Sequence, residues 1–118
     1  MGGSVTAEIT PAAQAFIRQH IKAVWQLELL LYLKKCEKAL TIVEVSRALQ
    51  LEPRAVEDCL RDFAEQNILH VDHEHRYKYL PKATLSKAID ETAKSYNERR
   101  ISVINFIYAQ PIGNLPEV

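Results

Sequence analysis

The stretch TIVEVSRALQLEPRAVEDCLRDFAEQNIL, residues 41–69, decides which fold this chain can adopt. It opens on Thr41 with Glu44 three residues later, and this spacing is typical of a capping box at the start of a helix. Residues 51–53 break the helical pattern, and Pro53 suits the first turn of a second helix. The second helix has one apolar face, which consists of Val56, Cys59, Leu60 and Phe63. The stretch therefore predicts two consecutive helices joined by a short turn.

A β-hairpin is expected directly after the second helix. Asn67 follows that helix at a position that suits the left-handed conformation, which asparagine tolerates. Residues 68–72 and 76–80 then alternate apolar and polar side chains, and residues 73–75 join them. Upstream, residues 39–41 form a short extended stretch. The central part of the chain is therefore predicted to be helical with one two-stranded hairpin.

Long helices are expected on both sides of this central part. Thr10 is a hydroxyl cap and Pro11 occupies the first helical position, so a helix begins there. Apolar residues recur on two faces between residues 10 and 37, which indicates a helix packed between other elements. The pattern leaves open whether this stretch is one helix or two helices with a break near His20. Another helix is expected from Thr84 until Pro111 ends it, with a candidate kink at residues 98–100.

These segments predict one mostly α-helical (α+β) domain with a two-stranded hairpin and long terminal helices. We expect a mobile arm over residues 1–9, the central domain with its leading helix over 10–82, a C-terminal helix over 83–110 and a tail over 111–118. The C-terminal helix is expected to pack on the core and to dimerise.

The composition is that of an ordinary globular domain. The chain has 118 residues, of which 47% are apolar and 25% charged, which excludes intrinsic disorder. The 15 basic and 15 acidic residues cancel, so net charge supplies no general attraction to nucleic acid or anionic membranes. Neither a signal peptide nor a membrane span is expected, which predicts a cytoplasmic protein with Cys36 and Cys59 as reduced thiols.

The order of helices, turn and hairpin resembles a winged helix-turn-helix. The pattern TIxEVSxALxL at residues 41–51 resembles the first helix of this motif, and PxxVxxCLxxFxxxNIL at residues 53–69 resembles the recognition helix and its exit into the wing. The resemblance is to the DNA-binding domain of the MarR/ArsR-like group of prokaryotic transcription regulators. It implies a transcriptional regulator with the helix from Pro53 in the major groove of double-stranded DNA and the wing on the backbone.

The candidate DNA-binding residues lie on this helix and on the wing. They are Arg54, Glu57, Arg61, His73, His75, Arg76 and Lys78. Residues 52–66 carry two arginines and five acidic residues, a net charge of −3 that opposes entry into a phosphate-lined groove. The acidic helix therefore favours an alternative, a winged-helix module that binds another protein and not DNA.

A homodimer is also expected, because the segment from residue 95 to 108 is apolar around more than one face. A monomer would leave part of that surface exposed, whereas a twofold partner would bury it. The expected interface consists of Phe16, Ile17, Tyr96, Val103, Ile104, Phe106 and Ile107.

The sequence gives little indication of metal binding or catalysis. Residues 70–75, HVDHEH, contain metal-ligating side chains, but in a strand only His70 and Asp72 share a face, so a solvated, DNA-facing wing tip is preferred to a metal site. Tyr77 and Tyr79 alternate with basic residues and suit either core packing or nucleic acid. Without a Gly-x-Ser-x-Gly elbow or a glycine-rich phosphate loop, we expect no enzyme, no metal and no cofactor.

Overall fold

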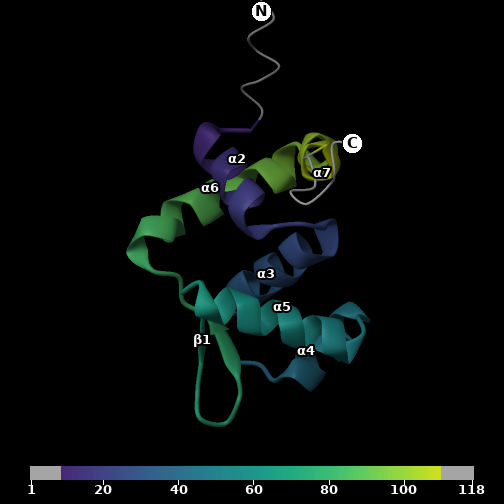
Figure 1. The fold of residues 1–118 in the computed structure, drawn as a ribbon, viewed down its shortest axis with the longest axis vertical. Helices are drawn as coiled ribbons and strands as arrows, with labels where there is room; N and C mark the ends of the chain where they lie inside the picture. Colours follow the sequence, from purple (N-terminus) through teal and green to yellow (C-terminus); the bar gives the residue numbers. More distant parts are fainter. Residues whose placement is uncertain (1–8, 110–118) are drawn as a thin grey trace, which may run out of the picture. The chain divides into compact units, whose positions relative to one another are not determined.

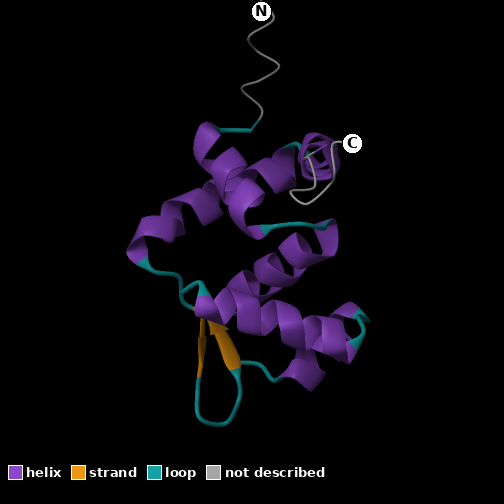
Figure 2. Cartoon of the chain, viewed as in Figure 1, coloured by secondary structure: helices purple, strands orange, loops and turns teal. Residues whose placement is uncertain are grey.

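The computed structural model describes residues 9–109, and these are mostly helical with a two-stranded antiparallel sheet, an α+β arrangement (Figures 1 and 2). The elements are, in order, α2 (Pro11–His20), α3 (Val24–Cys36), α4 (Ile42–Leu49), α5 (Pro53–Glu65), β1 (Leu69–Val71), β2 (Tyr77–Tyr79), α6 (Ala83–Glu98) and α7 (Arg100–Ala109). Within the described part, one compact unit spans residues 25–87, and a second combines residues 9–24 with 88–109.

The turn between α4 and α5 forms as its sequence predicts. The backbone N–H of Glu44 donates to Thr41 Oγ1 at 3.1 Å and that of Thr41 donates to Glu44 Oε1 at 2.9 Å, which confirms the capping box. Gln50 then takes a left-handed conformation with φ 56°. The Ser46 hydroxyl donates to the carbonyl of Leu51 at 2.6 Å, so side chain and backbone together hold the turn.

Helix α5 contacts both α4 and β1. It begins at Pro53, where the Glu52 carboxylate accepts from the backbone N–H of Ala55 at 3.0 Å. Its apolar face is buried as predicted, with Val56, Cys59, Leu60 and Phe63 all inside. Burial raises the pKa of the Cys59 thiol to about 12, so this group stays protonated.

The hairpin also confirms its prediction, although its strands are shorter than the alternating pattern. Leu69 pairs with Tyr79, and Val71 pairs with Tyr77. Leu40 exchanges two backbone hydrogen bonds with Tyr77, at 2.8 and 2.7 Å, and so adds an isolated bridge along the free edge of β2. Asn67 has φ 63°, the left-handed conformation expected of it. Tyr77 is buried and Tyr79 half-buried, so Tyr77 packs in the core.

The second unit is tied together by Thr10. Its side-chain oxygen accepts from the backbone N–H of Ala13 at 3.2 Å, which caps α2. The same hydroxyl donates to Glu91 Oε1 on α6 at 2.6 Å. The chain becomes extended at Ile21, so residues 10–37 hold two helices with the break near His20. Arg99 separates α6 from α7, at the position where a kink was expected.

Two expectations differ from the structure. Contacts group α2 with α6 and α7, whereas the sequence placed it in the domain of residues 10–82, because local pattern carries no information on which helix packs on which. Ile9, assigned to a mobile arm, is only 7% exposed. The rest of the arm, Pro111 and the tail lie outside the described residues.

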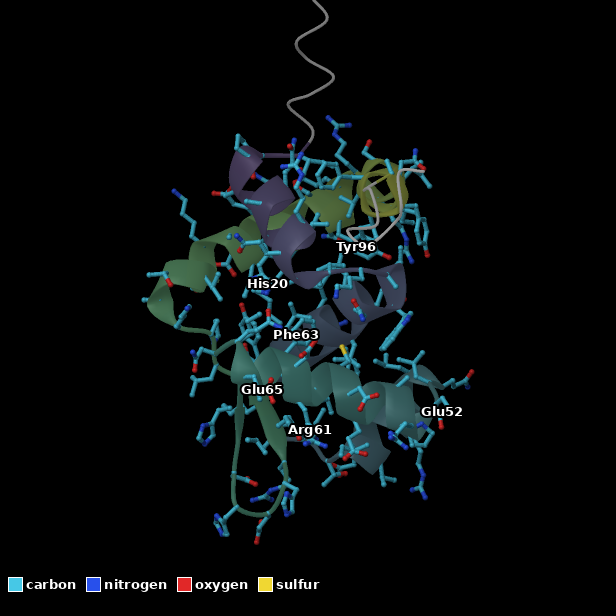
Figure 3. All side chains as sticks on the ribbon, viewed as in Figure 1. His20, Glu52, Arg61, Phe63, Glu65 and Tyr96 are labelled. Carbon is cyan, nitrogen blue, oxygen red and sulfur yellow. The ribbon has the colours of Figure 1, made fainter. Side chains whose placement is uncertain are left out.

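Replacement of Phe63 tests the packing of α5. Phe63 is 2% exposed and lies on the opposite side of α5 from Arg61 (Figure 3). Phe63→Ala should lower the free energy of unfolding by about 3–5 kcal/mol, because the removed ring leaves a cavity. Denaturant unfolding measures this loss, with Val43→Ala on the exposed side of α4 as a control that changes little. An unchanged midpoint for Phe63→Ala would show that its side chain is not in the core.

Candidate nucleic-acid interface

The exposed face of α5 carries charges of both signs. Because Phe63 and its apolar neighbours point inward, the opposite side of the helix is left to Arg54, Asp58, Arg61, Asp62 and Glu65, all of which are exposed. Glu52 and Glu65 stand at its two ends (Figure 3). Burial of one face therefore decides which charges face solvent.

Two of the five acidic residues between positions 52 and 66 already accept a hydrogen bond within the helix. Glu52 caps the helix, and Glu57 accepts from Arg61 Nη1 at 3.5 Å in an exposed pair one turn apart. Exposed pairs of this spacing contribute only about 0.3–0.5 kcal/mol, so a competing phosphate can take Arg61 from Glu57. In the part of the chain that the structure describes, Asp58, Asp62 and Glu65 make no ion pair.

Asp72 organises the tip of the hairpin. Its carboxylate accepts from the backbone N–H groups of Glu74 and Arg76, each at 2.9 Å, and from Arg76 Nε at 3.1 Å. These bonds, led by that from the Arg76 backbone, hold the pKa of Asp72 below its usual value, against a smaller opposing effect of desolvation. The turn that they close places His75 at φ 61°. After the end of β1 at Val71, the rest of HVDHEH is therefore a turn built around the Asp72 carboxylate.

Arg76 is held inside the same turn. Its guanidinium contacts Asp72 Oδ2 at 3.1 Å and Glu74 Oε1 at 2.6 Å, so two carboxylates flank one cation. His73 and His75 are exposed beside it. Within residues 9–109, no group of three His, Cys, Asp or Glu side chains is arranged to hold a metal ion. A contact from Arg76 to a phosphate would have to compete with both carboxylates.

Lys78 connects the hairpin to α3. Its ammonium donates to the carbonyl of Glu37 at 3.0 Å, at the carboxyl end of α3 where a cation is favoured by the helix dipole. Lys34 Nζ lies 5.8 Å from the ring centroid of Tyr79. These four residues line an open depression of about 370 Å³. Lys78, expected on a DNA backbone, thus has a structural contact of its own.

Two arginines flank the turn between α4 and α5. Arg47 lies in the last turn of α4 and Arg54 in the first turn of α5, and both are exposed. Among residues 9–109 neither forms an ion pair or a side-chain hydrogen bond. Arg54 was among the predicted residues, whereas Arg47 was missed. A basic residue in the last turn before the predicted break between two helices was the signal that could have identified it.

The residues expected at a dimer interface lie mostly inside one chain. Phe16, Ile17, Tyr96, Val103 and Ile107 are buried, and Ile104 and Phe106 are half-buried. The Arg18 guanidinium lies 5.0 Å from the ring centroid of Phe106 and covers part of it. The five buried side chains are therefore core residues, since a single chain buries them.

Comparisons of the chain with protein-family models, with curated proteins and with solved structures return no match. No helix in the described part of the chain is both long enough and apolar enough to cross a membrane.

The closed hairpin turn predicts a pH dependence. Because the pKa of Asp72 is lowered on folding, its stabilising effect is present above the unfolded value and is lost as the pH falls through the folded value. Asp72→Asn should lower the melting temperature at about pH 7, and the difference from the unaltered protein should shrink as the pH falls below the unfolded pKa of about 3.9 and the carboxylate becomes protonated. The exposed carboxylate of Glu65 supplies the control, since Glu65→Gln should show no such difference. A gap that persisted in acid would contradict the role of the Asp72 charge.

Proposed function

We propose that residues 25–87 form a winged helix-turn-helix, with α4 and α5 as the helix-turn-helix and the β1–β2 hairpin as the wing. The order of α3, α4, α5, β1 and β2 supports this assignment. The bridge of Leu40 to Tyr77 supports it further, because it adds a third extended segment, between α3 and α4, beside the two strands of the hairpin. In this proposal α5 is the recognition helix.

We infer that the protein is a regulator of transcription that binds double-stranded DNA through the amino-terminal end of α5. The observation that carries this proposal is the pair Arg47 and Arg54, exposed on both sides of the turn and without ion pairs among residues 9–109. Recognition helices contact base edges with their first residues, so Arg54 is placed to reach a guanine edge. Arg47 lies on the α4 side of the turn between the two helices, where we expect it to contact a phosphate.

Docking by this end separates the acidic residues near the carboxyl end of α5, Asp62 and Glu65, from the DNA. Glu65 is eleven residues beyond Arg54, which is about 16 Å along the helix axis. That distance exceeds the Debye length of about 8 Å at physiological salt, so the repulsion from Glu65 is largely screened. Asp58 is only one turn beyond Arg54 and opposes binding. The expected affinity is therefore modest and depends on few phosphate contacts.

Binding of another protein is the second candidate. Asp58, Asp62 and Glu65 follow one another at helical spacing along the exposed face of α5, and none has an ion pair within the described residues. Such a stripe complements a basic partner surface, where opposite charges steer association and fix orientation. This candidate uses the carboxyl half of α5, whereas the DNA proposal uses its amino end.

Salt-dependent binding to random-sequence duplex DNA tests the proposal. The affinity of the unaltered protein should fall as salt rises, and Arg47→Ala should reduce the slope by about one unit because one phosphate contact is lost. Arg54→Ala should weaken the preference among selected sequences. Lys94→Ala is the matched control: it removes one exposed positive charge from outside residues 25–87 and should leave both properties unchanged. No binding at low salt, or equal slopes for Arg47→Ala and Lys94→Ala, would contradict DNA docking through this turn.

A further inference from the structure

The open depression between the end of α3 and β2 brings two ammonium groups to one place. It has a volume of about 370 Å³ and is lined by Lys34 on α3, by Glu37 just after that helix, and by Lys78 and Tyr79 on β2. Lys34 Nζ lies 5.8 Å from the ring centroid of Tyr79, the residue that directly follows Lys78. The volume is at the lower end of the range for small-molecule sites.

The chain around this depression is basic, although the whole chain has no net charge. Residues 34–38 and Lys78 together carry four lysines and one carboxylate, a net charge of +3. The Glu37 carboxylate forms no ion pair with the residues that the structure describes, so it neutralises neither Lys34 nor Lys78. An anion that enters the depression is therefore attracted by both ammonium groups.

Lys78 keeps hydrogen-bond donors for a ligand. An ammonium group has three N–H donors, and one of them donates to the carbonyl of Glu37 at 3.0 Å. Among residues 9–109 the other two have no partner. The bond to Glu37 also holds the half-buried lysine side chain beside the depression, so a ligand loses less binding energy in ordering it.

We propose that this depression binds a small phosphate monoester that carries hydroxyl groups, which is the chemistry of a polyol or sugar phosphate. A monoester has a charge of about −1.5 to −2 at pH 7 and three acceptor oxygens, and these match two ammonium groups with several donors. The exposed carboxylate of Glu37 accepts from a hydroxyl group and repels a second phosphate. The ring of Tyr79 supplies an apolar wall for the carbon chain.

A phosphate diester of a nucleic-acid backbone fits these groups less well. It carries one negative charge, so it neutralises only one of the two lysines, and it offers no hydroxyl group to Glu37 when the strand is DNA. The proposed site shares no residue with the turn between α4 and α5 that carries Arg47 and Arg54. This inference therefore does not depend on the proposed DNA binding.

An NMR titration of the isotope-labelled full chain tests the site, with glycerol 3-phosphate as the smallest probe of this class. At about pH 7.5, where the monoester is a dianion, the backbone amide signals of residues 34–38 and 77–79 should shift and saturate. The dissociation constant should be in the millimolar range, because partly exposed ion pairs contribute little. Dimethyl phosphate, a diester with one charge, and inorganic phosphate, which lacks the hydroxylated carbon chain, should each bind about threefold to fivefold more weakly.

Variants test the residues. Lys34→Gln should weaken the binding of glycerol 3-phosphate about threefold to fivefold, the effect of one partly exposed ion pair. Lys87→Gln is the matched control: it removes one exposed positive charge from the same unit but not from the lining of the depression, and should leave the affinity unchanged. Glu37→Gln should reduce the preference for glycerol 3-phosphate over inorganic phosphate. Unshifted amide signals away from the depression show that each variant keeps the fold.

Three results would overturn the inference. Equal weakening by Lys34→Gln and Lys87→Gln would mean a diffuse attraction to positive charge. Equal affinity for dimethyl phosphate and glycerol 3-phosphate would mean that the lysines select no dianion. No shift at residues 34–38 and 77–79 up to about 50 mM glycerol 3-phosphate would mean that the depression binds no such ester. Failure of DNA binding would appear separately, as equal salt slopes for Arg47→Ala and Lys94→Ala.

Discussion

The arrangement of residues 25–87 depends on one constraint, the burial of the apolar face of α5. Leu60 and Phe63 are almost fully buried, and loss of either side chain would cost a large part of the stability of a domain this small. With that face inside, the rotation of α5 about its axis is set. Arg54, Asp58 and Glu65 lie on the opposite side of the helix and therefore face solvent. The chemistry of the candidate interface is thus a consequence of packing.

Which charges are available depends on local bonds that the charge count does not reveal. Arg76 is basic in the sequence, yet two carboxylates of its own turn flank it. Arg61 has a weak exposed pair, and Arg47 and Arg54 have none within residues 9–109. Of these four arginines, the two without an ion pair among residues 9–109 therefore lie beside the turn between α4 and α5, and not on the hairpin. This distribution moves the candidate interface from the hairpin to the amino-terminal end of α5.

The unit that combines residues 9–24 with 88–109 has a different organisation. Thr10 links the start of α2 to Glu91 on α6, and the buried side chains of α7 complete that unit from within one chain. The sequence indicated only that α7 is apolar on more than one side. Packing assigned Val103 and Ile107 to the interior and left Ile101 and Tyr108 outside. Which apolar side chains of α7 are exposed is therefore a result of packing.

The sequence by itself determined the features that depend on neighbours along the chain: the caps at Thr10 and Thr41, the left-handed Asn67 and the hairpin. These follow from hydrogen bonds and backbone preferences within a few residues, which pattern reports directly. Only the tertiary structure decided the break at Ile21, which no glycine or proline marks, and the grouping of α2 with α6 and α7. The tertiary structure alone also decided which side of α7 is buried. Each of these depends on which distant segment supplies the covering surface, and residues far apart in the chain leave no trace of that in local spacing.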